Sequence, residues 1–221
     1  MIERLSGDAA HPLRLIFVRH AEAAHADGRC IGHTDLALSE RGRMSLTALT
    51  APNGGLAHAL ANTLQTLDDE PTDAMVVTSD LQRAHETALA IATRFDLPLL
   101  TDPRLREMHF GNWDGRNWHE LEVTEGAALR EWMAQWTRHA PPGGETVADL
   151  VARMESALET FGTLPCDTVV VVSHAGWIRA ALCKLRGIPY TQMFDIPVDH
   201  LSVTVFELER PGGVAASMPL P

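Results

Sequence analysis

The chain has 221 residues and a formal net charge of −11, from 18 basic and 29 acidic residues. A protein this acidic is a poor candidate for binding nucleic acids or membrane surfaces, because both need a broad positive field. Every basic residue except Lys184 is arginine, the side chain that holds oxyanions through paired hydrogen bonds. Codon composition is the simpler explanation of this bias, so only the surroundings of individual arginines connect it with phosphate.

The composition is that of a globular protein, with 45% hydrophobic and 21% charged residues, and the length fits one domain over residues 1–221. The three cysteines form no C-x-x-C pair, which argues against a disulfide framework and suits a reducing compartment. We find no signal-peptide pattern, and no apolar run approaches the ~20 residues that span a bilayer. We therefore expect a cytoplasmic protein without a membrane partner.

Four short aliphatic runs predict β-strands. In chain order they are Leu13–Val18, Ala74–Thr78, Thr168–Val172 and His200–Leu208. Runs that are aliphatic almost throughout indicate strands covered on both faces, as in a parallel sheet flanked by helices. The fourth run differs, because Leu201, Val203 and Val205 alternate with other side chains.

Between these runs, apolar residues at three- and four-residue spacings predict α-helices. The predicted helices span residues 40–67, 80–95, 146–161 and 176–186. The first is interrupted by a Pro-Asn-Gly-Gly sequence at residues 52–55, where we expect a loop. Ser79 is expected to cap the second helix, and Thr146 with Asp149 forms an acidic capping box for the third. This alternation predicts an α/β domain with three layers, in which helices flank a mostly parallel sheet.

Residues 105–138 differ from the rest, because they hold four of the five tryptophans. We expect a small helical insertion here, over about residues 105–145, laid over the edge of the sheet. The tryptophans could stack on an aromatic ligand, but such residues more often form a core. Exposed tryptophans would also permit a homodimer, and the sequence leaves the oligomeric state open.

Arginine and histidine side chains follow three of the predicted strands. Arg19 and His20 follow the first strand, Arg83 lies in the first turn of the helix after the second, and His174 follows the third. Ligands of open α/β sheets bind beyond the carboxyl ends of the strands, where helix N-termini add partial positive charge. Each residue alone has an ordinary explanation, such as a solvated turn or a helix cap. Agreement among three strand ends predicts a local anion site.

Four stretches carry these residues and one acidic residue along the chain. They are LIFVRHAE at 15–22, SDLQRA at 79–84, LREMHFGNWDG at 105–115 and VVSHAG at 171–176. Together they resemble the motifs of the histidine phosphatase superfamily, the phosphoglycerate-mutase-like proteins, over nearly the whole chain. Within it, three stretches look most like the α-ribazole phosphatases of cobalamin synthesis. These are RCIGHTDLALSERG at 29–42, EMHFGNWDG at 107–115 and PPGGET at 141–146.

The resemblance implies a phosphoglycerate-mutase-like fold and a role for each side chain. His20 is expected to attack phosphorus and become a phosphohistidine, and Glu107 to protonate the leaving group. His174 is expected to donate a further hydrogen bond to the phosphoryl oxygens. The phosphate is expected to be bound by Arg19, Arg83 and Gly32. No metal or other cofactor is then needed, because these side chains supply the positive charge.

The chain departs from the family pattern at three alanines. Ala21, Ala23 and Ala26 stand where the family usually has glycine, threonine and asparagine. Glycine fits a tight turn more easily than alanine, and loss of the asparagine removes one phosphate donor. We therefore expect either slower activity or a donor from elsewhere, for example from the backbone at Ile31 and Gly32. These departures bear on the substrate more than on the fold, because both arginines, both histidines and the glutamate remain.

The leading hypothesis is a metal-independent phosphomonoesterase with α-ribazole 5′-phosphate as substrate. A cofactor-dependent phosphoglycerate mutase or a broad-specificity phosphatase is the alternative enzyme, although the short stretch between Glu107 and His174 favours a phosphatase. A phosphate-sensing or interaction protein on a weakened scaffold is the alternative of another class, against which His20 and Glu107 argue. The expected partner is a small phosphorylated molecule, not a nucleic acid or a membrane.

Overall fold

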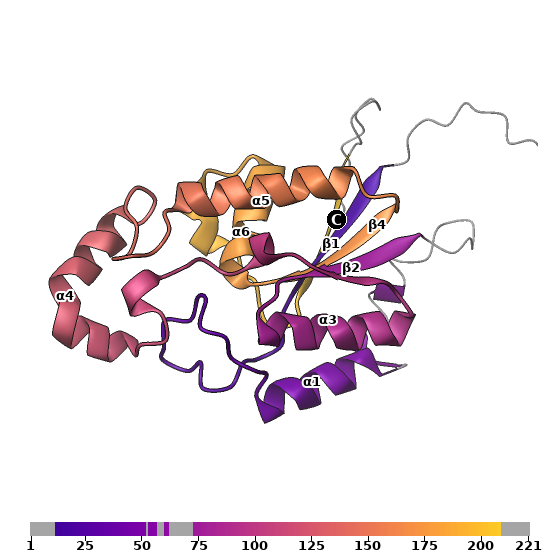
Figure 1. Ribbon diagram of the computed structural model, residues 1–221, viewed down its shortest axis with the longest axis horizontal. Coiled ribbons are helices and arrows are strands. Elements are labelled where there is room, and N and C mark those ends of the chain that lie inside the picture. The colour runs from indigo at the N-terminus through magenta and orange to yellow at the C-terminus, as the bar shows by residue number, and fades with distance from the viewer. Residues whose placement is uncertain (1–11, 52, 57–59, 62–72, 209–221) are drawn as a thin grey trace, which may run out of the picture.

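The computed structural model describes residues 12–51, 53–56, 60–61 and 73–208, in which helices flank a five-stranded sheet (Figure 1). The strands are β1 (Leu13–Arg19), β2 (Ala74–Thr78), β3 (Leu99–Thr101), β4 (Thr168–Ser173) and β5 (Val203–Leu208). Their spatial order is β3-β2-β4-β1-β5. All neighbouring strands are parallel except β1 and β5, which are antiparallel. The predicted α/β fold with a mostly parallel sheet is confirmed.

The aliphatic runs locate three of the strands to within one residue. β2 has the predicted bounds, and β1 and β4 each extend one residue further, to Arg19 and Ser173. β5 begins at Val203 and not at His200, because the chain turns at Leu201, where φ is 59°. β3 has no counterpart among the predicted strands, since three residues at a sheet edge are too few to show a pattern.

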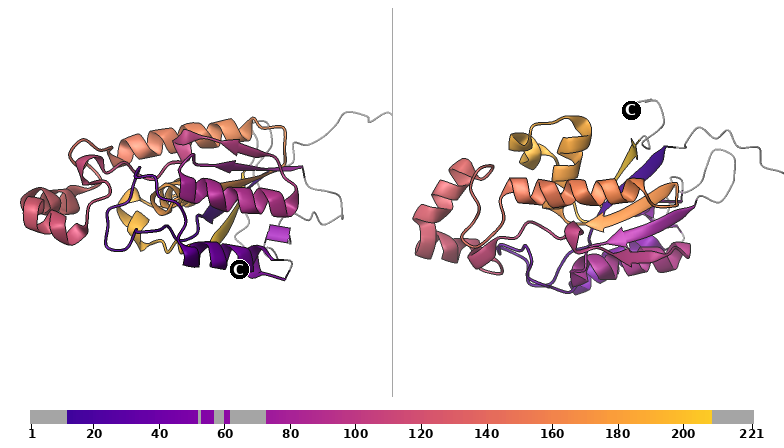
Figure 2. Two further views of the ribbon diagram at one scale, coloured as in Figure 1. Left: turned by 60° about the horizontal axis from the view of Figure 1, so that its bottom comes forward. Right: turned by 45° about the horizontal axis from the view of Figure 1, so that its top comes forward.

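Helices cover both faces of the sheet (Figure 2), and a hydrophobic core lies between the sheet and the helices on each face. The flanking helices are α1 (Glu40–Thr50), α3 (Gln82–Phe95), α5 (Val147–Gly162) and α6 (Ala175–Arg186). α5 and α6 cover one face, and α1 and α3 cover the other. Alternate residues of β1 enter the two cores, with Leu15 and Phe17 on the α5 side and Ile16 and Val18 on the α3 side. Strands buried on both faces explain the aliphatic runs.

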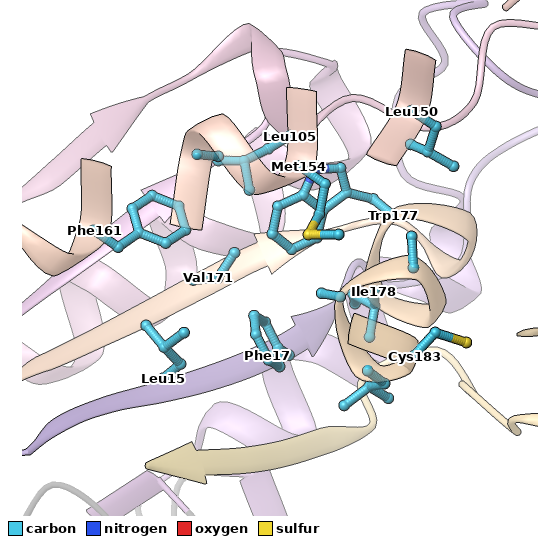
Figure 3. Packing of buried hydrophobic residues seen from close by; sticks show 14 of the residues in the cluster. Leu15, Phe17, Leu105, Leu150, Met154, Phe161, Val171, Trp177, Ile178 and Cys183 are labelled. Atoms are coloured by element: carbon cyan, nitrogen blue, oxygen red, sulfur yellow. The ribbon is translucent and has the colours of Figure 1, made fainter. Parts of the chain in front are cut away.

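Large side chains fill the core under α5 and α6 (Figure 3). Phe17 of β1 meets Trp177 of α6 edge to face, with ring centroids 6.0 Å apart, and Met154 of α5 lies beside the indole. The Trp177 indole is fully buried, and its Nε1 donates to the carbonyl of Arg104 at 2.9 Å. This packing fixes the first turn of α6 against the carboxyl ends of β1 and β4.

Local capping chemistry sets the helix starts only in part. The predicted capping box of Thr146 and Asp149 begins α5 and is confirmed. The prediction that Ser79 caps α3 is wrong, because the N-cap residue is Leu81. The Oγ of Ser79 accepts a hydrogen bond from the N–H of Leu81 at 3.3 Å, before the first helical residue. α1 ends at Thr50, before the predicted loop. Most of the rest of the predicted 40–67 helix lies outside the described residues.

The Trp-rich segment lies beyond the carboxyl ends of the strands (Figure 1). Its helix α4 (Trp118–Gln135) packs in a small separate cluster with Trp113 and with Cys30 from the loop after β1. Trp113 is fully buried, which supports the interpretation of this residue as core. No helix in the described part of the chain is long and apolar enough to cross a membrane.

Candidate active site

The site is built around His20, the residue that follows β1. Its N–H donates to the carbonyl of Ser173 at 3.0 Å, so the two central strands position it. Ring atom Nδ1 lies 2.6 Å from the carbonyl oxygen of Ala21. A carbonyl only accepts hydrogen bonds, so Nδ1 carries the proton and Nε2 keeps its lone pair. The ring thus has the tautomer of a nucleophile with Nε2 as the attacking atom.

The surroundings of His20 keep it neutral. The side chain is almost completely buried. Burial lowers the pKa of His20 well below its ordinary value, and the guanidinium groups of Arg83 and Arg19 lower it further by repelling a second proton. The bond to the Ala21 carbonyl raises the pKa but does not outweigh these effects. Neutral imidazole is the form that attacks phosphorus.

Ala21 fits this turn without the glycine that the resemblance predicts. Its φ is not in the left-handed region, which among described non-glycine residues only His25, Asp96 and Leu201 enter. The residue is fully buried, and its N–H donates to Thr87 Oγ1 of α3 at 3.1 Å. The alanine therefore introduces no backbone strain next to the nucleophile.

Arg83, which is buried, and Arg19, which is half-buried, provide positive charge beside His20. Arg83 is 1% exposed, and its two Nη atoms donate to the carbonyls of Thr34 at 2.9 Å and Gly32 at 2.7 Å. Arg19 donates from Nη1 to the carbonyl of Val198 at 2.7 Å, and its buried Nε has no partner within the described structure. Carbonyls orient both groups without neutralising them. Their charge thus remains available to an anionic ligand.

His174 lies behind His20, with the two ring centroids 4.9 Å apart. It is fully buried, and neither of its ring nitrogens has a hydrogen-bond partner among the described residues. Burial, followed by the charge of Arg83, lowers the pKa of His174 well below the ordinary value. Buried polar atoms without partners are costly, which is consistent with a group whose partner is a ligand.

Glu107 is held by the backbone at the start of α6. Its Oε1 accepts from the N–H of Met108 at 2.9 Å, and its Oε2 accepts from the N–H of Gly176 at 3.1 Å. The motif stretches therefore meet in space as expected. The carboxyl group is fixed at the rim of the same pocket as His20.

The pocket beside His20 has a volume of about 390 Å³. Arg19, His20, Arg83 and Glu107 line it, together with the loop after β1 and His200. None of the tryptophans of residues 105–138 lines it. A larger hollow of about 500 Å³ along α5 contains none of the predicted site residues. The candidate site is therefore identified by the side chains that line it and not by its volume.

Gly32 is not among the residues that line the pocket. Its N–H donates to Asp114 Oδ1 at 3.1 Å, and its carbonyl accepts from Arg83. A Cβ atom here would lie 2.2 Å from the carbonyl oxygen of Met108. Gly32 orients Arg83 by these bonds, and direct contact of its backbone with phosphate stays a prediction.

His200 completes the pocket and has no counterpart among the predicted site residues. Its ring centroid lies 5.5 Å from that of His20. Burial and the charge of Arg19 lower the pKa of His200 to about 4. The backbone N–H of Leu201 donates to the carbonyl of Arg19 at 3.0 Å, which brings this turn to the nucleophile. Only the pairing of β5 with β1 creates this proximity, and no local pattern indicates it.

A sequence profile of the histidine phosphatase superfamily (branch 1) matches residues 15–219. The chain belongs to the histidine phosphatase superfamily. The four motifs quoted from the sequence all lie within the match, and the resemblance that they indicated is confirmed. Of the residues in these motifs, Arg19, His20, Arg83 and Glu107 line the pocket, and His174 lies against His20 without lining it.

Relatives within the superfamily are phosphatases with different substrates. Phosphoserine phosphatase 1 of Hydrogenobacter thermophilus is 31% identical over 200 residues, 90% of this chain and 88% of the relative. Adenosylcobalamin/alpha-ribazole phosphatase of Salmonella typhimurium is 28% identical over 192 residues, 85% of this chain and 87% of the relative. The crystal structure of the alpha-ribazole phosphatase from Shigella flexneri gives a TM-score of 0.73 at 25% identity, over 93% of this chain and all of that one. This superfamily member is therefore a phosphatase.

Arginines supply the positive charge of the pocket in this superfamily member. Besides Arg19 and Arg83, Arg29 and Arg41 line it. Arg41 is paired with Glu22, whereas the only side-chain hydrogen bond described for Arg29 is from Nη1 to the carbonyl of Gly115. Ala23 and Ala26 also line the pocket and leave methyl groups where the superfamily usually has polar side chains. Among the described residues, no group of three or more His, Cys, Asp or Glu is placed to hold a metal ion.

Proposed function

We propose that this phosphatase is a metal-independent phosphomonoesterase that acts through a phosphohistidine at Nε2 of His20. The observation that carries the proposal is the hydrogen bond from His20 Nδ1 to the Ala21 carbonyl. It leaves Nε2 unprotonated beside the buried Arg83 and the half-buried Arg19. Binding of phosphate alone does not require a neutral nucleophile or a nearby acid. Both are present here in one pocket.

The first step transfers the phosphoryl group to the enzyme. Nε2 of His20 forms a bond to phosphorus while the bond from phosphorus to the ester oxygen breaks. The protonated carboxyl group of Glu107 gives its proton to the departing oxygen. Arg19, Arg83 and His174 donate hydrogen bonds to the three other phosphoryl oxygens, and donors of this kind are each worth about 3–4 kcal/mol of barrier.

The second step hydrolyses the phosphohistidine. The Glu107 carboxylate takes a proton from a water molecule, whose oxygen attacks phosphorus. The bond between phosphorus and Nε2 breaks, its electron pair returns to His20, and inorganic phosphate leaves. Glu107 ends the cycle protonated, as it began, so the two steps balance without a further reactant.

The finer proposal is that the substrate is α-ribazole 5′-phosphate, a small phosphorylated molecule of the cytoplasm. The stretches at 29–42, 107–115 and 141–146 support it, as do the relative and the neighbouring structure with that activity in their names. Phosphoserine is the second candidate, because a relative of comparable identity and coverage carries that name. A phosphoglycerate mutase would instead pass the phosphoryl group to a second hydroxyl group.

Hydrolysis of 4-nitrophenyl phosphate in the presence of a chelator tests the mechanism. The parent protein is expected to turn over, and His20→Ala to lose at least ~10³-fold in kcat. An acid-labile, base-stable phosphoenzyme is expected in the parent only. Equal activity in the two proteins would exclude His20 as the nucleophile, and binding of phosphate without turnover would favour a sensing protein.

A substrate panel then decides between the finer candidates. We expect the largest kcat/KM with α-ribazole 5′-phosphate, compared with phosphoserine and 3-phosphoglycerate. A larger value for phosphoserine would replace the first candidate by the second. Formation of 2-phosphoglycerate from 3-phosphoglycerate without release of inorganic phosphate would identify a mutase.

A further inference from the structure

The segment that carries Glu107 is held by its carbonyl groups. Residues 104–107 begin within the short 3₁₀ helix η1 (Pro103–Leu105), continue past its end and belong to no strand. Each of their four carbonyl oxygens accepts a hydrogen bond from a side chain. The donors are Trp177 Nε1 and Arg153 Nη1 to Arg104, Ser173 Oγ to Leu105, Arg153 Nη1 to Arg106, and Arg153 Nη2 and His33 Nε2 to Glu107. Side chains distant in sequence therefore fix the path of this segment.

Arg153 of α5 makes half of these bonds. Its Nη1 lies 2.8 Å from the carbonyl oxygen of Arg104 and 2.6 Å from that of Arg106, and its Nη2 lies 2.9 Å from that of Glu107. Its Nε and Nη2 also donate to the two carboxylate oxygens of Glu145, at 3.1 and 2.6 Å. All five N–H donors of the guanidinium group are therefore used. Lysine has three donors on one atom and does not reproduce this planar arrangement.

Glu145 holds Arg153 in place and is itself anchored. Its Oε1 also accepts from the backbone N–H of His109 at 2.8 Å. The exposed fractions of the Arg153 and Glu145 side chains are 18% and 15%. The pair is therefore a mostly buried connection between α5 and the segment on both sides of Glu107.

This connection stands outside the pocket but sets its geometry. Neither Arg153 nor Glu145 lines the pocket. The carbonyl bound by Arg153 and the carboxyl group that faces the pocket belong to the same residue, Glu107. A shift of the backbone therefore moves the carboxyl group relative to His20. Displacements of about 1 Å typically cost about 10²-fold in rate.

We infer that Arg153 is a positioning residue for the reaction, which places the Glu107 carboxyl group for proton transfer to the leaving oxygen. The inference rests on the proposed function, in which Glu107 is the acid. A residue with only a structural role would lower stability or lower all rates together. A residue that places the acid affects most the substrates whose leaving oxygen needs a proton.

A series of aryl phosphates separates these outcomes. 4-Nitrophenyl, 4-chlorophenyl and phenyl phosphate have similar size but leaving oxygens of increasing basicity. The measured quantity is kcat/KM, which reports the steps up to phosphoryl transfer to His20. We expect Arg153→Lys to lower kcat/KM for phenyl phosphate about tenfold more than for 4-nitrophenyl phosphate. Glu107→Gln should show the same selective loss, and the double variant should add no further selectivity.

Two further variants keep the test decisive. Glu145→Gln leaves Arg153 in the chain but weakens its anchor, and it should show a smaller selective loss in the same direction. Glu155 lies two residues from Arg153 on α5 and makes no contact with the Glu107 segment in the hydrogen bonds given above. Glu155→Gln removes only its ion pair with Lys184 of α6. This control should keep the parent pattern. Thermal unfolding and circular dichroism establish that each variant is folded.

The outcomes for the inference and for the proposed function differ. If Glu107→Gln shows the selective loss but folded Arg153→Lys and Glu145→Gln keep the parent pattern, Arg153 does not position the acid. The same holds if Arg153→Lys does not fold and Glu145→Gln keeps the parent pattern. If Glu107→Gln itself shows no selective loss, or His20→Ala remains active, the proposed function fails.

Discussion

Glu107 and Gly176 approach each other so closely that a larger residue at the second position would displace the Glu107 carboxyl group. A Cβ atom at Gly176 would lie 2.2 Å from Oε1 of Glu107, while the N–H of Gly176 donates to Oε2. The glycine thus allows the first turn of α6 to hold the Glu107 carboxyl group by its backbone. The contact links the motif of the acid to the motif of His174.

We predict that Gly176→Ala lowers kcat/KM by about 10- to 100-fold, because the new methyl group displaces the Glu107 carboxyl group. Alanine favours helices, so α6 should stay intact and the melting temperature should change little. The matched control is Gly162→Ala at the end of α5, where a Cβ would meet nothing within 4 Å. Unchanged activity in Gly176→Ala would contradict the described position of the carboxyl group.

The second prediction concerns which ring nitrogen of His20 carries the proton. Because Nδ1 donates to the Ala21 carbonyl, nitrogen NMR should show a proton on Nδ1 and none on Nε2 at neutral pH. The ring should remain neutral at pH 6, since its pKa lies well below the ordinary value of 6.5. Observation of a doubly protonated ring at pH 6 would contradict both statements.

Buried neutral histidines predict the dependence of stability on pH. The pKa values of His20 and His174 are lowered in the folded chain, so below pH 6.5 the unfolded chain binds protons that the folded chain does not. The free energy of unfolding should therefore fall as pH decreases below 6.5, by about 1.4 kcal/mol per pH unit for each ring.

Chemical denaturation between pH 5 and pH 7 measures this slope. The lowered pKa values of Asp80 and Asp114 act in a more acidic range, because stability from such groups is lost only as pH falls through their folded pKa. His174→Gln should remove one ring's share of the slope. A slope unchanged by this substitution would rule out His174 as a source.

Asp114 is predicted to support phosphate binding from a distance. Its carboxylate accepts from the N–H groups of Gly32, His33 and Thr34 at 3.1, 2.7 and 2.9 Å, and the carbonyls of the first and third hold Arg83. Asp114→Asn loses acceptor capacity, so stability should fall by about 1–3 kcal/mol. Inhibition by inorganic phosphate should weaken about tenfold as Arg83 loses its orientation.

The matched control for Asp114→Asn is Asp149→Asn. Asp149 also accepts from a backbone N–H, that of Thr146 in the exposed capping box of α5. Its substitution should lower the melting temperature without an effect on phosphate inhibition. Equal inhibition in both variants would show that the turn at residues 32–34 does not orient Arg83.

The central strands, one helix cap and the family were readable from the sequence because each depends on neighbouring residues. β2 and β4 are aliphatic runs buried between two layers of helices, and the capping box of Thr146 and Asp149 joins residues three apart. Arg19, His20 and Arg83 could also be recognised locally, because each lies shortly after a predicted strand. Parallel strands bring such positions to one edge of the sheet, which is why a shared pocket could be expected.

Only the tertiary structure decided how these residues are oriented. The donors to residues 104–107 come from α5, α6, β4 and the loop after β1, and His200 reaches the pocket through the pairing of β5 with β1. The hydrogen bonds of Gly32 with Asp114 and Arg83 are likewise long-range contacts. Such contacts join residues far apart in the chain, so no periodicity or motif encodes them locally. The sequence by itself determined the family and the residues that we propose to carry the chemistry, and long-range hydrogen bonds and strand order decided where each side chain points.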